Sequence, residues 1–221
     1  MTLHAKRFIL PALIVKSPHA AAMVQGVPLL DGRKAYKTVE VRGARCRTLY
    51  RGAVAIFASN AYDSSVENHY TWFGAWSEQS DKRRAVKLAT EQDYRFRAWS
   101  QYTHAWRYSL LGYVRLTDCI DGKKLDFDGK AMRALHVGAT DFRSDWTDPD
   151  RPNIYLKVEP LAERQLADGP KFNTVCYGCI VQQPPHSAVA CHVNWQTVSL
   201  AQSDIPPHVQ EEIRPWPLPT K

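Results

Sequence analysis

The first long apolar run, 8–15, reads FILPALIV and holds eight residues without a charge. It predicts a buried strand, because a strand covered on both faces needs no polar alternation. A short helix is predicted next, over 18–25. Ser17 is a favourable N-cap residue, Pro18 suits the first helical position, and Gly26 is a natural stop.

The stretch 37–42 reads KTVEVR and alternates polar residues with valines. Alternation with period two predicts a half-buried strand, with Thr38, Glu40 and Arg42 on one face and Lys37 at the strand entrance. A Glu and an Arg on one strand face can form an ion pair that holds the guanidinium rigid for a phosphate or a base edge. The alternative is an ordinary structural ion pair.

The remaining pattern adds more strands than helices. Strands are predicted over 52–58, which ends at Ser59 and Asn60, and over 109–120, 154–161, 172–182 and 187–200, the last two forming a hairpin. The segment 80–107 lacks Gly and Pro and is predicted to be helical. Its aromatic residues near 96–106 form a stripe that either faces the core or stacks unpaired bases.

This order of elements predicts an α+β fold, built as a small, partly open β-barrel with peripheral helices. One domain is expected over 8–200, with a helical insertion at about 61–107. The tail, 201–221, is rich in proline, and from Pro206 it is predicted to be extended or disordered.

The net charge of +7 over 221 residues is concentrated near the N-terminus. Residues 1–60 hold ten Lys and Arg against Asp31 and Glu40 alone, and a second basic surplus lies at 82–107. Clustering of this kind is typical of proteins that meet polyanions, the alternative being a solvated basic face without a partner. No apolar run is long enough to span a membrane, so no membrane partner is expected.

The five cysteines suit a reducing compartment better than a disulfide scaffold, and a cytoplasmic protein is expected. Lys6 and Arg7 before the first apolar run imitate a signal peptide, but Lys16 closes that run early, which favours a strand. Cys176, Cys179 and the adjacent pair Cys191–His192 resemble zinc ligands. Adjacent strand residues point to opposite faces, so we expect buried β-residues there and no metal.

One ordered set of short motifs resembles the ASCH domain, a member of the PUA-like superfamily. The shared pattern is a small helix with a Pro and a final Gly, then Lys, Glu-x-Arg, and Arg-Gly before an apolar strand that ends in Ala-Ser. It is matched in order by Pro18, Gly26, Lys37, Glu40, Arg42, Arg51, Gly52, Ala58 and Ser59. The resemblance covers 12–60 well and 108–120 loosely.

The resemblance implies a PUA-like barrel with a cleft, and binding of RNA or DNA. Some members are ribonucleases or amidohydrolases of modified nucleosides, and the hydrolases use a Lys with a Thr three residues later. Here that second position is Glu40, and the nearest threonine is Thr38. Lys34, in the preceding GRK, competes with Lys37 for the role of the motif lysine.

The expected function is nucleic-acid binding, with RNA the more expected partner. The candidate binding residues are Lys34, Lys37, Arg42, Arg45, Arg51, Ser59 and Asn60. The first alternative is a metal-independent ribonuclease or a hydrolase of a modified nucleoside, in which Lys37 and Glu40 would be catalytic. The second is a protein-interaction domain with a basic face. No phosphate-binding or dinucleotide motif is present, so no cofactor is expected.

Overall fold

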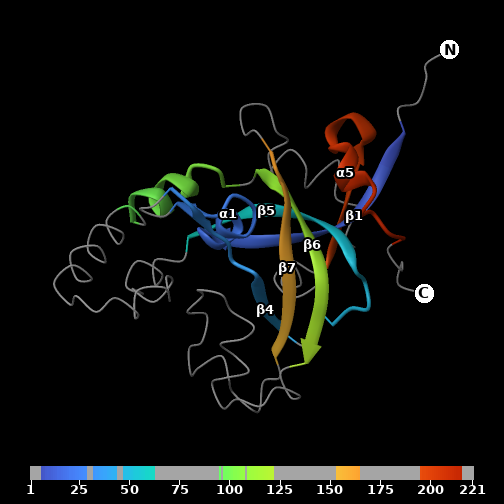
Figure 1. Ribbon diagram of the computed structural model, residues 1–221, viewed down its shortest axis with the longest axis horizontal. Helices are drawn as coiled ribbons and strands as arrows, with labels where there is room; N and C mark the ends of the chain where they lie inside the picture. Colours follow the sequence, from blue (N-terminus) through green and yellow to red (C-terminus); the bar gives the residue numbers. More distant parts are fainter. Residues whose placement is uncertain are drawn as a thin grey trace, which may run out of the picture.

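The computed structural model describes residues 6–28, 32–43, 47–62, 95, 97–107, 109–121, 153–164 and 195–215. Its central feature is a six-stranded mixed sheet, which crosses the middle of Figure 1. In the order in which they lie side by side, the strands are β4 (Val39–Gly43), β7 (Asn153–Glu163), β6 (Leu110–Asp121), β5 (Gly52–Tyr62), β1 (Arg7–Ser17) and β8 (Gln196–Ala201). β1 and β5 run parallel, and the other neighbouring pairs are antiparallel.

The other elements are short. β2 (Val27–Pro28) pairs with β3 (Lys34–Ala35), and α1 (His19–Val24) follows β1. A helical segment covers 97–104, while η8 (Gln202–Asp204) and α5 (Pro207–Gln210) follow β8. Over the part of the chain that the structure describes, a mixed sheet with few helices confirms the predicted α+β class. Among the described residues, no helix has the length and hydropathy to cross a membrane.

The large sheet is curled but does not close into a barrel. β4 and β8 lie at opposite ends of the strand order, and the described residues contain no pairing between them. Bulges at Leu111 and Thr117 in β6, and at Leu161 in β7, increase the local twist. The partly open barrel predicted from the sequence is therefore an open, curled sheet.

A contact between distant strands shows how far the sheet curls. Arg42 of β4 donates a hydrogen bond to the carbonyl of Ile14 in β1, although β7, β6 and β5 lie between these strands in the sheet. In a flat sheet, strands four positions apart would be about 19 Å apart, which is beyond the reach of an arginine. The curl therefore brings β4 back towards β1.

The inner face of the sheet is the one covered by α1, whose six residues are all buried. The core on this face includes Ala21 and Met23 of α1 and alternate residues of the strands, such as Val54 and Ile56. Gly112 of β6 allows α1 to lie this close. Its φ is 152°, and a Cβ there would meet the side chain of Val24 and backbone atoms of β7.

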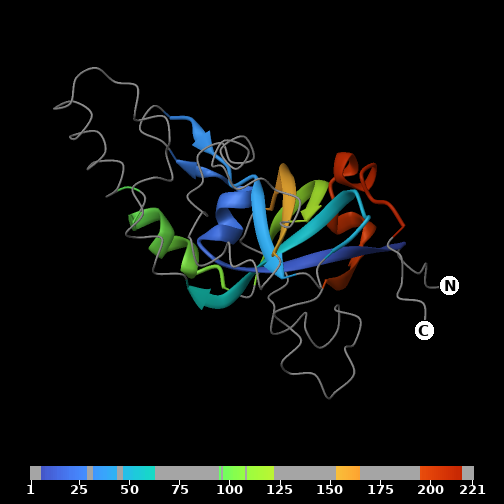
Figure 2. The same cartoon turned by 90° about the horizontal axis from the view of Figure 1, so that it is seen from below.

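The outer face is covered by the chain after β8, drawn in red in Figures 1 and 2. Ile205 and Val209 are buried there against Phe57 and other outward residues, and Ile213 packs at the edge. The prediction of an extended or disordered chain from Pro206 is therefore wrong for the helical residues 207–210. Prolines begin α5, and Val209 packs on the outer face together with Ile205 before the helix and Ile213 after it.

Two other predicted elements, a helix and a strand, differ at their ends. The helix predicted over 18–25 is α1, and Gly26 follows it with a φ of 74°, as a stop requires. The predicted cap by Ser17 is wrong, because Ser17 pairs with Tyr62 as the last residue of β1, and Pro18 holds the cap position. The strand predicted over 52–58 continues to Tyr62.

Some predictions fall partly or wholly outside the described residues. Of the helical insertion expected at about 61–107, residues 63–94 lie outside them, and 97–104 are helical. Of the predicted hairpin, 172–182 lies outside them, whereas β8 corresponds to the end of its second strand. The first strand is confirmed, because β1 spans 7–17 and most of its residues from Leu10 to Val15 are buried.

Candidate functional site

Three charged side chains from one short segment meet inside the molecule. The Nζ of Lys37 lies 3.6 Å from Glu40 Oε2, and Nη2 of Arg42 lies 2.9 Å from Glu40 Oε1. The exposed fractions of the three side chains are 2% for Lys37, 11% for Glu40 and 17% for Arg42. We call these residues the Lys37–Glu40–Arg42 cluster.

The pairing of β4 with β7 turns the cluster inward. Glu40 lies opposite Leu156 and Arg42 opposite Ile154 in the antiparallel register. Directly opposed residues share a face, and both of these β7 residues belong to the inner core. The polar face of the predicted strand is therefore its inner face, whereas simple amphipathic alternation would place it in solvent.

Lys37 is positioned by α1 rather than by the sheet. Its backbone N–H donates to the carbonyl of Ala22, and the next residue, Thr38, accepts from the N–H of Val158 in β7. These two bonds fix the entry to β4 between the helix and the sheet. The lysine predicted at the strand entrance is thus buried, with 3% of the residue exposed.

Arg42 keeps a donor available after its contacts are counted. Nη2 serves both Glu40 Oε1 and the carbonyl of Ile14, each at 2.9 Å. Nε is buried and makes no hydrogen bond. Because a guanidinium cannot deprotonate in a protein, a buried donor of this kind favours a hydrogen-bond acceptor brought by a ligand.

The cluster places two cationic side chains beside one carboxylate in a largely buried setting. Buried polar groups are normally hydrogen-bonded, and a buried donor that is not can be satisfied by an acceptor on a ligand. Through Arg42, the arrangement is therefore suited to bind an acceptor-bearing group in a fixed orientation.

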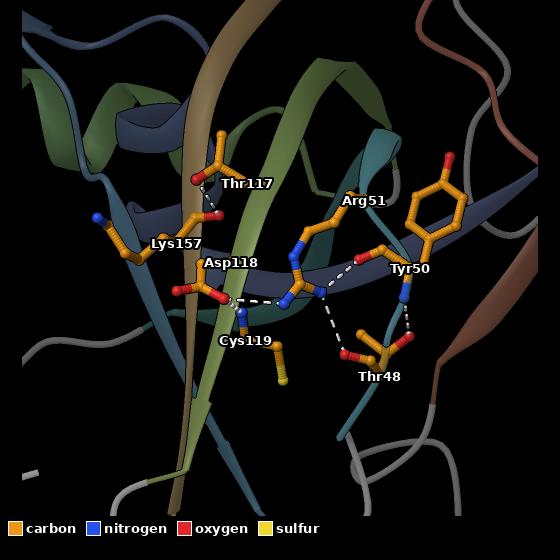
Figure 3. A network of polar contacts seen from close by, with 7 residues as sticks. All are labelled: Thr48, Tyr50, Arg51, Thr117, Asp118, Cys119 and Lys157. Carbon is orange, nitrogen blue, oxygen red and sulfur yellow. Dashed lines mark hydrogen bonds and ion pairs between the residues drawn. The ribbon is translucent and has the colours of Figure 1, made fainter. Parts of the chain in front are cut away.

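Two of the other predicted cations are engaged in ion pairs at the periphery. Lys34 lies 3.6 Å from Glu163 in a pair exposed on both sides. Arg51 is bound more extensively, as Figure 3 shows: it donates to the carbonyls of Thr48 and Tyr50 and to Asp118 Oδ1 at 2.8 Å. These contacts give Arg51 a structural role, and its predicted contact with nucleic acid remains a prediction.

Ser59 and Asn60 lie in an irregular part of β5, and Arg45 lies outside the described residues. Val15 pairs with Ala58 and Ser17 with Tyr62, so three residues of β5 stand opposite one of β1. Ser59 Oγ accepts from the N–H of Ala61 at 3.1 Å, which is the local turn chemistry of serine. Asn60 is exposed. No described contact brings either residue to the cluster.

The sequence did not reveal which residues complete these contacts. The carbonyl of Ile14 and the acids Asp118 and Asp121, the second paired with Arg47, lie far along the chain from their partners. The acids were visible as polar breaks near the end of the strand 109–120, but their pairing depends on the fold. Among the described residues no group of His, Cys, Asp or Glu could hold a metal ion, and Cys176, Cys179 and Cys191 lie outside them.

Comparison with known proteins adds no relative. No protein-family model matches the chain, and a search of curated proteins finds no significant match.

Proposed function

We propose that the protein binds nucleic acid, with RNA the expected partner, through the Lys37–Glu40–Arg42 cluster. The observation that carries the proposal is a partly buried arginine, Arg42, whose Nη2 is held by a carboxylate and a backbone carbonyl while its buried Nε lacks an acceptor. Phosphate oxygens and the acceptor atoms of bases are the groups that such an arginine recognises.

A PUA-like fold of the ASCH type is proposed with it. Three features support it: the small buried helix α1 before the motif, the motif on β4, and the apolar strand β5, in which Ser59 follows the core residue Ala58. The curled sheet that brings β4 back to β1 suits a barrel-like architecture. Cysteine usage supports a cytoplasmic setting.

The burial of the cluster favours recognition of one nucleotide over contact along a duplex. An 11% exposed carboxylate and a 17% exposed arginine offer a small contact area. The charges of Lys34, Arg47 and Arg51 are offset by acids, so these residues add less to long-range attraction than their number suggests.

The test is fluorescence anisotropy with labelled single- and double-stranded RNA and DNA, at low and at physiological salt. Arg42→Lys keeps the charge but loses the guanidinium fork, and we expect it to weaken binding about tenfold or more. Arg7→Lys, at an exposed arginine bonded to Ser199, is the matched control and should bind like the wild type. Circular dichroism of both variants checks that the fold is kept.

Binding should weaken as salt rises, because phosphate contacts release counterions. A flat salt response, or equal affinities for Arg42→Lys and the wild type, would contradict the proposal. Failure of every oligomer to bind would leave free nucleosides or a protein partner to be examined.

One observation favours a hydrolase as the second candidate. The ammonium of Lys37 faces the carboxylate of Glu40 at 3.6 Å in a buried setting, where a proton could pass between a reacting group and the pair. Denaturing gels of the same samples would detect cleavage. Cleavage products that still form in the presence of EDTA would indicate a metal-independent reaction. If Lys37→Met abolishes these products but still binds the oligonucleotide, the hydrolase is favoured over a binding module.

A further inference from the structure

The Lys37–Glu40–Arg42 cluster presents hydrogen-bond acceptors as well as donors. The two oxygens of a carboxylate accept hydrogen bonds at about four positions. Among the described residues, the carboxylate of Glu40 meets Arg42 Nη2 at 2.9 Å and Lys37 Nζ at 3.6 Å, and the second distance is longer than an ordinary hydrogen bond. Glu40 therefore keeps acceptor positions for a ligand, on the residue that pairs with Arg42 and its unbonded Nε.

The donors and acceptors of the cluster are held in a fixed order. Glu40 and Arg42 lie in β4, which pairs with β7 along its whole length. Arg42 Nη2 is held in addition by the carbonyl of Ile14, and the backbone of Lys37 is held by Ala22 of α1. Because these contacts exist without a ligand, binding a ligand of matching pattern requires little further ordering of the site.

The Watson–Crick edge of guanine has the pattern that complements this order. It presents the acceptor O6, then the donor N1–H, and then the donor N2–H₂, so one carboxylate can accept from both donors while a cationic group donates to O6. Uracil offers one donor between two acceptors. Neutral cytosine and adenine each offer an amino donor next to an acceptor nitrogen. Guanine is thus the standard base that places two donors side by side.

A phosphate group matches the cluster less well than this edge does. It offers acceptors alone, and it would leave the acceptor positions of Glu40 unused. An oxyanion bound at Arg42 would also lie close to the carboxylate that is 2.9 Å from Nη2, and like charges at such range repel. The carboxylate therefore favours a base edge over a phosphate at this position.

We infer that the cluster reads the Watson–Crick edge of an unpaired guanine and that Glu40 determines this preference. The carboxylate of Glu40 accepts from N1–H and N2–H₂, and Arg42 Nε donates to O6. The inference rests on the proposed function and deepens it by naming the base. It also requires a single strand, because in a duplex the same edge of guanine pairs with cytosine.

The test is competition against a labelled single-stranded RNA that contains guanine, followed by fluorescence anisotropy. The competitors are the monophosphates of guanosine, adenosine, cytidine and uridine. Two analogues are added: inosine monophosphate, which lacks the N2 amino group, and the monophosphate of 1-methylguanosine, which lacks the N1 hydrogen. Guanosine monophosphate should compete about tenfold more strongly than the other three nucleotides and than either analogue.

A variant of Glu40 tests the same preference from the side of the protein. Glu40→Gln keeps the size of the side chain but replaces one acceptor oxygen by a donor, so the preference for guanosine should fall about tenfold. Glu159→Gln, at an exposed carboxylate 3.4 Å from Arg115, is the matched control and should keep the preference. Circular dichroism checks the fold of both variants, and the analogues test the wild type directly if Glu40→Gln does not fold.

The outcomes separate this inference from the proposed function. Equal competition by the four nucleotides, stronger competition by one of the other three, or competition by ribose 5-phosphate as strong as that by guanosine monophosphate would overturn the inference. The proposed function stands in each of these cases if Arg42→Lys weakens binding of the RNA. If the wild type binds no nucleic acid, the proposed function fails and the inference fails with it.

Discussion

At the scale of single residues, Gly112 decides how closely α1 approaches the sheet. Its φ of 152° is strained for any residue with a side chain, and a Cβ would lie 2.6 Å from Val24 Cγ1. We expect Gly112→Ala to lower the free energy of unfolding by about 3 kcal/mol, the strain and the overpacking acting together. Urea denaturation followed by circular dichroism measures the change.

Gly32→Ala is the matched control for this variant. Gly32 also has a left-handed φ, 83°, but a Cβ there would meet nothing within 4 Å. Only the backbone cost remains, about 1 kcal/mol. Equal losses for the two variants would mean that the contact between α1 and β6 is looser than the structure indicates.

The sequence could predict those contacts of the site that join residues close together in the chain, but not those that join distant residues. Glu40 and Arg42 are two residues apart, so strand alternation alone predicted their shared face. Their inward direction depends on β7, and the bond from Arg42 to Ile14 spans 28 residues of chain. The alternation of polar and apolar residues within one strand does not indicate which distant strands pack against it. The burial of the cluster therefore could not be predicted from the sequence.

At the scale of elements, the connection 47–51 is fastened to the end of β6. Arg51 reaches Asp118, which also accepts from the N–H of Cys119 at 2.7 Å, and the bulge at Thr117 lies next to it (Figure 3). Thr117 Oγ1 donates to the carbonyl of Lys157, which holds β7 against the bulge. These bonds tie the chain before β5 to the strands on either side of the bulge.

We expect Arg51→Met to lower the free energy of unfolding by about 1 kcal/mol, because the pair is partly exposed but three of its hydrogen bonds are lost. A double-mutant cycle with Asp118→Asn in urea denaturation measures the coupling. Arg115→Met with Glu159→Gln, an exposed pair at 3.4 Å, is the comparison and should couple less. Loss of nucleic-acid affinity in Arg51→Met without loss of stability would restore Arg51 as a contact residue.

Element ends were harder to predict than element types for a physical reason. β5 was expected to stop at Ser59 and Asn60, which favour turns, yet pairing with β1 resumes at Tyr62 after a bulge. A neighbouring strand can therefore extend a strand past residues that would end it alone. The chain after Pro206 shows the reverse case: its composition favoured disorder, yet Val209 of the short helix α5 and the neighbouring Ile205 and Ile213 pack on the outer face of the sheet.

At the scale of the whole molecule, two cores on opposite faces of one sheet share β1, β5 and β6, and β1 also carries the carbonyl of Ile14 that Arg42 bonds. The inner core holds α1 against β1, β5, β6 and β7, and the outer core binds the C-terminal segment to β1, β5 and β6. Tyr113 of β6 belongs to the outer core, and its hydroxyl donates to the carbonyl of Asp204 at 3.2 Å. Loosening the outer face should therefore lower the stability of the strands beneath the site.

Alkaline titration tests this dependence. Burial raises the pKa of Tyr113 from 10.0 to about 12, an effect that the nearby Arg164 partly offsets, and burial also raises the pKa of Tyr50 and of Tyr155. The unfolded chain releases these phenolic protons at a lower pH than the folded chain does. Stability from this source is therefore complete below about pH 10 and is lost as the pH rises towards 12.

Tyr113→Phe removes the ionisable group and keeps most of the packing. Between pH 10 and pH 12, its free energy of unfolding should therefore decrease by about 2 kcal/mol less than that of the wild type. Urea denaturation at several pH values, with tyrosinate absorbance followed in parallel, measures both the stability and the ionisation. Tyr102→Phe, at an exposed tyrosine, is the control and should leave the slope unchanged. An equally steep fall in Tyr113→Phe would place the alkaline sensitivity outside the outer core and separate it from the contact with Asp204.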